Sequence, residues 1–187
     1  MLTARPTNEE KPGLVSLEWW YDIFHADKQV GSLEFKRRTG QGAFTIDGRA
    51  CTVDRLTDQP VERVYQALIR MSKGGEKPPA NPWALKDASG QVLAQADLAV
   101  KTGMLDPGFA VSRGHAVFAF RQPSYSVVFR PYQLYRQGSD ESLGSVGREK
   151  TFTRTLQMNL PAGFDAPFQL FLLVLLLQKI QAQKESD

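Results

Sequence analysis

Cysteine and histidine are scarce in this chain of 187 residues, which contains one cysteine and two histidines. A single cysteine, Cys51, excludes an internal disulfide and is typical of proteins from a reducing compartment, so we expect a cytoplasmic protein. His25 and His115 have no cysteines or carboxylates around them at ligand spacing, which argues against a zinc site. We therefore expect no metal.

Motifs for catalysis and cofactor binding are also missing. The sequence contains neither a G-x-S-x-G nucleophile elbow nor a glycine-rich phosphate loop. Cys51 alternates with Val53 in an apolar pattern, which favours a buried, inert thiol over a nucleophile. We expect a protein that is not an enzyme and that needs no cofactor.

No apolar run is long enough to cross a bilayer. The segment Phe168–Leu177 (FQLFLLVLLL) has ten residues, whereas a spanning helix needs about 20. A helix without a polar face must be enclosed by protein on all sides. Asp165 suits its N-cap and Pro167 its first turn. We expect no transmembrane span and a buried central helix over residues 165–183.

Neither sign of charge dominates, since 23 basic and 20 acidic residues leave a net charge of +3. This balance argues against a specific nucleic-acid binder, which concentrates basic residues in a stripe. The start, MLTARPTNEEKPG, is polar and lacks the apolar core of a secretory signal. We expect residues 1–15 to form a flexible leader and residues 16–187 to form one domain.

Short alternating runs separated by turn residues make up most of the chain, a pattern typical of all-β barrels and sandwiches. Turns are indicated at 26–28, 88–90, 113–114 and 138–141, and Asp47-Gly48 is a dipeptide favoured in two-residue hairpins. The runs amount to about a dozen strands. A barrel that wide needs something inside it, and the apolar helix meets that need. The predicted fold is mainly β: a closed antiparallel barrel of about twelve strands around the hydrophobic C-terminal helix.

Two features depart from the alternation. Apolar residues spaced three and four apart predict a helix over residues 60–73. The alternative is a strand whose inward residues are Tyr65, Ala67, Ile69 and Met71. Strict alternation puts Arg154 on the inward side of the last strand with Leu156 and Met158, where a lone charge is costly. Either a bulge turns it outward, or it pairs with an acid or with the C-terminal carbonyls of the buried helix, and we expect a structural role.

Three segments carry a family resemblance: the hairpin W-x-L-x-D-x-x-G-x-V-L-A over Trp83–Ala94, the pair L-Y-R and L-G-S-V-G-R over Leu134–Arg148, and the terminal FQLFLLVLLL. Together they resemble the tubby C-terminal-like superfamily, which includes LURP-one-related proteins and phospholipid scramblases. The resemblance covers residues 16–183 and implies a twelve-stranded barrel around a hydrophobic helix. The phosphoinositide-binding lysine and arginine of tubby proteins match no specific positions here, and scramblase-type cysteine-rich, proline-rich and calcium-binding segments are missing.

Basic residues are unevenly placed, with a cluster at a strand end and seven from Arg113 to Arg154 against three acids. Solvated charge on outer strand faces is the usual reason for such runs and is the interpretation we favour. The functional alternative is a rim whose arginine forks bind phosphate oxygens. The candidates for phosphate or lipid-headgroup contact are Lys36, Arg37, Arg38, Arg113, Arg130, Arg148 and Lys150.

Three functions are compatible with these patterns. The first is a non-enzymatic binding or recruitment module, peripheral at a membrane, for an anionic phospholipid headgroup or a protein partner. The second is a barrel that holds a small apolar ligand, which the central helix opposes because it takes up the interior. The third is an enzyme that uses His25, His115 or Cys51, and it ranks last. We expect the first.

Overall fold

The computed structural model of the protein describes residues 1–7, 18–56, 82–98, 108–123, 131–149 and 154–184. Within these ranges the chain forms twelve strands and one long helix. They are β1 (Leu2–Pro6), β2 (Glu18–His25), β3 (Lys28–Lys36), β4 (Gln41–Ile46), β5 (Arg49–Arg55), β6 (Trp83–Asp87), β7 (Val92–Leu98), β8 (Phe109–Arg113), β9 (Ala116–Arg121), β10 (Tyr132–Arg136), β11 (Ser142–Arg148), β12 (Leu156–Asn159) and α2 (Ala166–Lys184).

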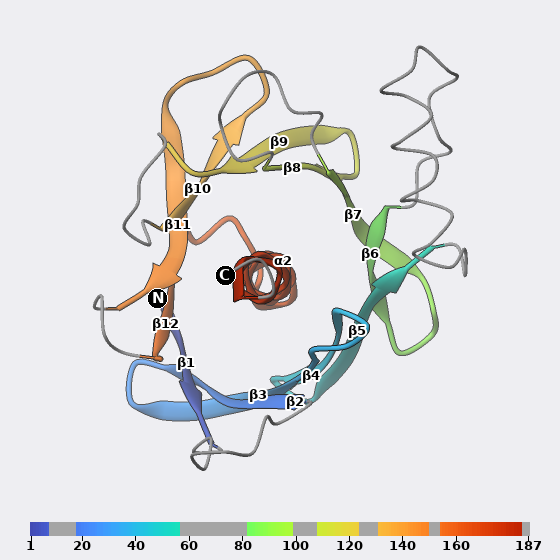
Figure 1. The fold of residues 1–187 in the computed structure, drawn as a ribbon, viewed down its shortest axis with the longest axis vertical. Helices are drawn as coiled ribbons and strands as arrows, with labels where there is room; N and C mark the ends of the chain where they lie inside the picture. Colours follow the sequence, from blue (N-terminus) through green and yellow to red (C-terminus); the bar gives the residue numbers. More distant parts are fainter. Residues whose placement is uncertain (8–17, 57–81, 99–107, 124–130, 150–153, 185–187) are drawn as a thin grey trace.

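The strands close into a single antiparallel barrel. Each strand pairs with the strands before and after it in sequence, and β1 pairs with β12 to complete the circle. Figure 1 looks along this barrel, with α2 seen end-on at its centre. The predicted twelve-stranded barrel around a C-terminal helix is confirmed. In an up-and-down barrel, successive connections lie at alternate ends.

The strands and turns follow local sequence rules. In β2, Trp19, Tyr21 and Ile23 are buried, while Trp20 between them is 41% exposed. The turn between β4 and β5 has Asp47 at φ 48° and Gly48 at φ 76°, the positive values that a tight hairpin needs. The predicted hairpin turns at 88–90, 113–114 and 138–141 also join adjacent strands.

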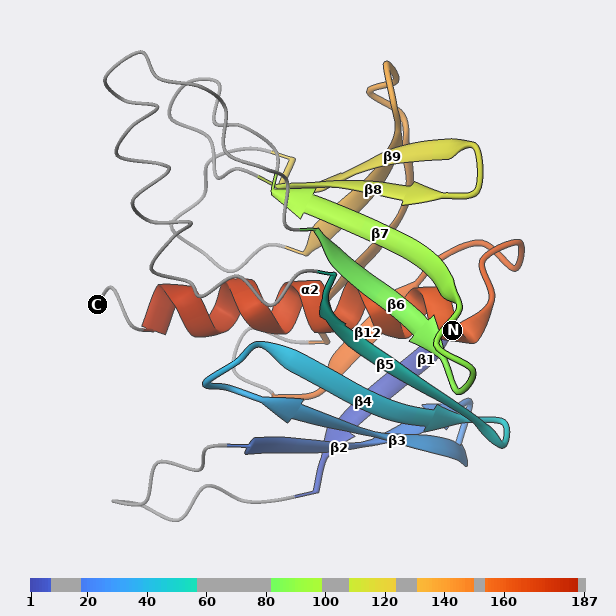
Figure 2. The same cartoon turned by 90° about the vertical axis from the view of Figure 1, so that its right-hand side faces the viewer.

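The helix α2 lies along the barrel, as Figure 2 shows from the side. Asp165 is its N-cap, because the Oδ1 atom accepts a hydrogen bond from the Phe168 backbone N–H at 3.1 Å. Gln169, a polar residue in an apolar run, donates from Nε2 to the Phe164 carbonyl at 2.8 Å. Every residue from Phe168 to Leu177 is buried, so the prediction of an enclosed helix is confirmed.

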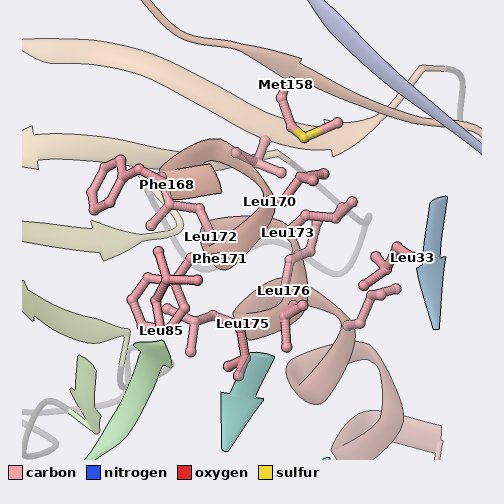
Figure 3. Packing of buried hydrophobic residues seen from close by; sticks show 14 of the residues in the cluster. Leu33, Leu85, Met158, Phe168, Leu170, Phe171, Leu172, Leu173, Leu175 and Leu176 are labelled. Carbon is pink, nitrogen blue, oxygen red and sulfur yellow. The ribbon is translucent and has the colours of Figure 1, made fainter. Parts of the chain in front are cut away.

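Core side chains from opposite sides of the barrel meet on this helix. Figure 3 shows leucines of α2 between Leu33 of β3, Leu85 of β6 and Met158 of β12. The approach of β4 is close enough to require glycine: a Cβ at Gly42 would lie 2.7 Å from a methyl of Val174. The helix is therefore packed against the wall and does not merely lie in an open lumen.

One expectation was wrong. Residues 2–6, placed in a flexible leader, form β1, because barrel closure needs a strand between β2 and β12 and because Leu2 and Ala4 are buried there. Arg154, for which an outward position and an inward pair were both open, is exposed and precedes β12, so the alternation does not extend to it. The expected helix over residues 60–73 lies outside the described residues.

None of the helical segments in the described ranges is both long and apolar enough to cross a membrane.

Candidate functional site

The two ends of the barrel differ in what they contain. At one end α2 begins, near the β8–β9 hairpin, where Arg113 lies 2.8 Å from Asp165. At the other end α2 finishes beside the β3–β4 turn, where Gln178 donates from Nε2 to the Gly40 carbonyl at 2.8 Å. Figure 2 shows the first end on the right and the second on the left.

Three arginines face inward where α2 finishes. Each follows a buried residue by two positions: Arg37 follows Phe35, Arg55 follows Val53, and Arg148 follows Val146. The period of two in a strand carries these side chains toward the interior at its rim. With their neighbours they form what we call the basic mouth: Lys36, Arg37, Arg38, Arg55, Arg148 and Lys179.

Acidic residues offset this charge in part. The described carboxylates towards the mouth end are Glu18 at the start of β2, Asp54 and Asp97 next to the ends of β5 and β7, Glu149 after β11, and Glu34 two residues before Lys36. Asp54 is paired with Lys86, whose Nζ atom lies 2.8 Å from its Oδ1 atom. The opposite end mixes both signs and carries six described carboxylates at hairpin turns or at the start of α2, namely Asp27, Asp47, Asp87, Asp140, Glu141 and Asp165. The two ends of the barrel therefore differ in charge.

Arg37 holds the end of the helix. Its guanidinium lies 5.1 Å from the Trp19 ring centroid, and its Nε donates to Gln181 Oε1 at 2.8 Å. Gln181 belongs to the last turns of α2 and is itself buried. Arg37, a sequence candidate for phosphate contact, thus has a structural role in the fold.

Arg113 does the same at the start of the helix. Its guanidinium lies 5.0 Å from the Phe168 ring centroid, and its Nη2 is 2.8 Å from Asp165 Oδ2. Because the other oxygen of Asp165 caps α2, this arginine fixes the cap. Arg113 lies at the end of the barrel opposite to the other described candidates.

Arg55 also lies over an aromatic ring, but it differs from Arg37 and Arg113 in its other contacts. Its guanidinium lies 4.8 Å from the ring centroid of Trp83, the residue opposite it on β6. It is half-buried, and burial lowers the pKa of the guanidinium. Among the described residues, the Trp83 ring is the only partner of Arg55.

The remaining candidates vary in exposure. The Lys36 side chain is 51% exposed, with Nζ 3.9 Å from a Glu34 carboxylate oxygen, and Arg38 is exposed. Arg148 is half-buried, opposite Leu156. Arg130 and Lys150 lie outside the described residues.

Sequence reasoning missed Arg55 and Lys179. The alternation of Cys51 and Val53, already recognised as inward, extends to Arg55 and was a usable signal. Lys179 lies 5.4 Å from the Phe109 ring centroid, a contact between the helix and β8 that no sequence pattern indicates.

The thiol and the imidazoles lie away from the mouth. Cys51 is buried, and burial, aided by Asp87 and Asp165, raises the pKa of its thiol. His25 and His115 are exposed beside hairpin turns at the end where α2 begins. No group of three or more histidine, cysteine or acidic residues within the described ranges could hold a metal ion.

Comparisons with models of protein families, with curated proteins and with solved structures found no match to this chain. What the basic mouth does must therefore follow from its own side chains.

Proposed function

We propose that the protein is a non-enzymatic binding module that attaches itself to anionic phospholipid headgroups through the basic mouth. The observation that carries this proposal is the gathering of cations from β3, β5, β11 and α2 at one end of the barrel. Arginine forks bind phosphate oxygens in pairs. Each basic residue near an anionic membrane contributes about 1 kcal/mol.

The barrel interior supports a surface role over storage of an apolar ligand. The core of α2 is buried from Phe168 to Leu177, so such a ligand would have to displace the helix. We also propose distant kinship with the tubby C-terminal-like superfamily, which the twelve-stranded barrel around a C-terminal helix supports. The proposed site of action is the cytoplasmic face of a membrane, since a protein with a single, buried cysteine suits a reducing compartment.

The test is vesicle flotation with matched double variants. Lys36→Ser/Arg38→Ser removes two exposed cations from the mouth and leaves Arg37, which holds the helix, in place. Lys28→Ser/Arg49→Ser removes two exposed cations from the opposite end and has the same net charge. Vesicles contain either phosphatidylserine with phosphatidylcholine or phosphatidylcholine alone.

We expect the wild type and the control variant to bind phosphatidylserine vesicles, and the mouth variant to bind about tenfold or more weakly. Binding should fall steeply with salt, because the Debye length shrinks from about 10 Å at 0.1 M to about 3 Å at 1 M. Equal loss in both double variants would show that net charge alone matters. If the wild type binds no anionic vesicle at low salt, a protein partner becomes the surviving hypothesis.

A further inference from the structure

We infer that Arg55 and Trp83 form a specific site for a phosphate monoester within the basic mouth. This inference rests on the proposed function and deepens it, because it names the group that is recognised and the residues that recognise it. Diffuse attraction by surface cations does not distinguish one anion from another, whereas a held guanidinium does.

The first argument is a comparison within the molecule. The fold places an inward arginine on an aromatic ring three times, with Arg37, Arg55 and Arg113. Arg37 and Arg113 each have an acceptor on or next to α2, in Gln181 and Asp165. Arg55 is the member of this set for which the described residues supply no acceptor.

The second argument is energetic. A guanidinium has five N–H donors in one plane. Stacking on Trp83 covers one face and leaves the edge that carries those donors available. Half-burial removes part of the water that would otherwise satisfy them, and unmet donors are costly when they lose water. An incoming oxyanion would meet both the charge and the donors of Arg55.

The surroundings favour a dianion. Trp83 borders the β3–β4 turn, because a Cβ at Gly40 would lie 3.1 Å from the Trp83 ring. Arg38 belongs to that turn and Lys36 immediately precedes it, so the turn that borders Trp83 carries further positive charge. A phosphate monoester carries about −1.5 to −2 charges near neutral pH and has three acceptor oxygens, whereas a phosphodiester has a single charge. The monoester is the better fit.

The same chemistry occurs in two sources, a lipid with a terminal phosphate and a soluble phosphate ester. The vesicle arm compares phosphatidic acid, which has a monoester, with phosphatidylserine, which has a diester, at equal surface charge. The soluble arm adds glycerol 3-phosphate and follows the indole N–H signal of Trp83 by ¹H–¹⁵N NMR, assigned from Trp83→Phe.

The variants are Arg55→Gln, Arg55→Lys and the control Arg49→Gln. Arg49 is an exposed residue at the opposite end of the same strand, β5, so the control removes the same charge from the same element. Arg55→Lys keeps the charge but loses the planar fork. Thermal unfolding verifies that each variant is folded, and Arg55→Lys keeps the test valid if Arg55→Gln does not fold.

We expect the wild type and Arg49→Gln to prefer phosphatidic acid over phosphatidylserine. Arg55→Gln and Arg55→Lys should lose that preference, with about a tenfold fall in affinity for phosphatidic acid, the size of one charge-assisted hydrogen bond. Glycerol 3-phosphate should shift the Trp83 signal in the wild type and not in Arg55→Gln. A shift without any lipid preference would support the site and assign it to a soluble ester.

Two results would overturn the inference. One is a wild type that prefers phosphatidic acid together with an Arg55→Gln variant that keeps the same preference, which would leave the proposed function standing if the Lys36/Arg38 variant still loses binding. The other is a Trp83 signal that glycerol 3-phosphate does not move in the wild type. Failure of the wild type to bind any vesicle, with the Trp83 shift present, would remove the proposed function and retain the site.

Discussion

Leu173 lies in the middle of α2 and has an exposed fraction of 0%. Leu173→Ala removes three carbon atoms from a position that the barrel wall surrounds. We expect this substitution to destabilise the protein strongly, because the barrel cannot collapse onto the space that is left.

The complete burial of Leu173 determines how large the loss of stability should be. Leucine-to-alanine changes at enclosed sites cost about 3–5 kcal/mol, out of a total stability of about 5–15 kcal/mol. For a chain of this length each kcal/mol lowers the thermal midpoint by about 2–4 °C, so the expected fall is on the order of 10 °C. Leu173→Asp buries a carboxylate without a partner and should prevent folding, as should removal of residues 165–187.

The assay is thermal and urea unfolding followed by circular dichroism. Leu93→Ala is the matched control, because Leu93 is a leucine on β7 that is 36% exposed and should change stability by less than about 1 kcal/mol. An equal effect of Leu173→Ala and Leu93→Ala would refute an enclosed helix. A protein without residues 165–187 that melts at the wild-type temperature would do the same.

Three further predictions concern single side chains. Asp165→Ala should lower stability by about 1 kcal/mol more than Asp165→Asn in urea unfolding, because asparagine still caps the helix. Cys51 should react with a disulfide reagent only at the rate at which the protein opens, measured by absorbance against a urea-unfolded sample, since burial raises the pKa of its thiol. Hydrogen bonds from the Ser89 hydroxyl and from the Gln91 and Ser89 N–H groups lower the pKa of Asp87. Its ionised form therefore stabilises the fold above the unfolded pKa of about 3.9, and this stabilisation is lost as the pH falls through the lower folded pKa. Asp87→Asn should make the melting temperature depend less on pH on the acid side.

Features set by neighbouring residues could be predicted from the sequence. The tight turn at Asp47-Gly48 needs positive φ at both positions, and these residues tolerate it. The enclosed helix follows from a run that lacks a polar face. β1 was not predicted, because a five-residue strand beside a polar segment has too short an alternation of apolar and polar residues to be recognised. Its pairing with β2 and β12 defines it as a strand.

The roles of the arginines needed the fold. Arg37 and Arg113 both lie on aromatic rings, yet their acceptors are 144 and 52 residues away along the chain. No local pattern distinguishes an arginine that has such an acceptor from one that lacks it. For Arg55, alternation from Cys51 indicates the inward direction, whereas the lack of an acceptor among the described residues is a property of the assembled barrel mouth.

The topology separates the proposed binding residues from the cap of the helix. Because strands adjacent in sequence are adjacent in space, the short hairpins β2–β3, β4–β5, β6–β7, β8–β9 and β10–β11 all lie at the end where α2 begins. There Asp165 and Arg113 fix the start of the helix. The opposite end carries the basic mouth. Changes at that end, Arg37 and its contact with Gln181 aside, leave the helix cap and the hairpin turns intact, so a barrel of this kind can change what it binds while the core around α2 stays the same.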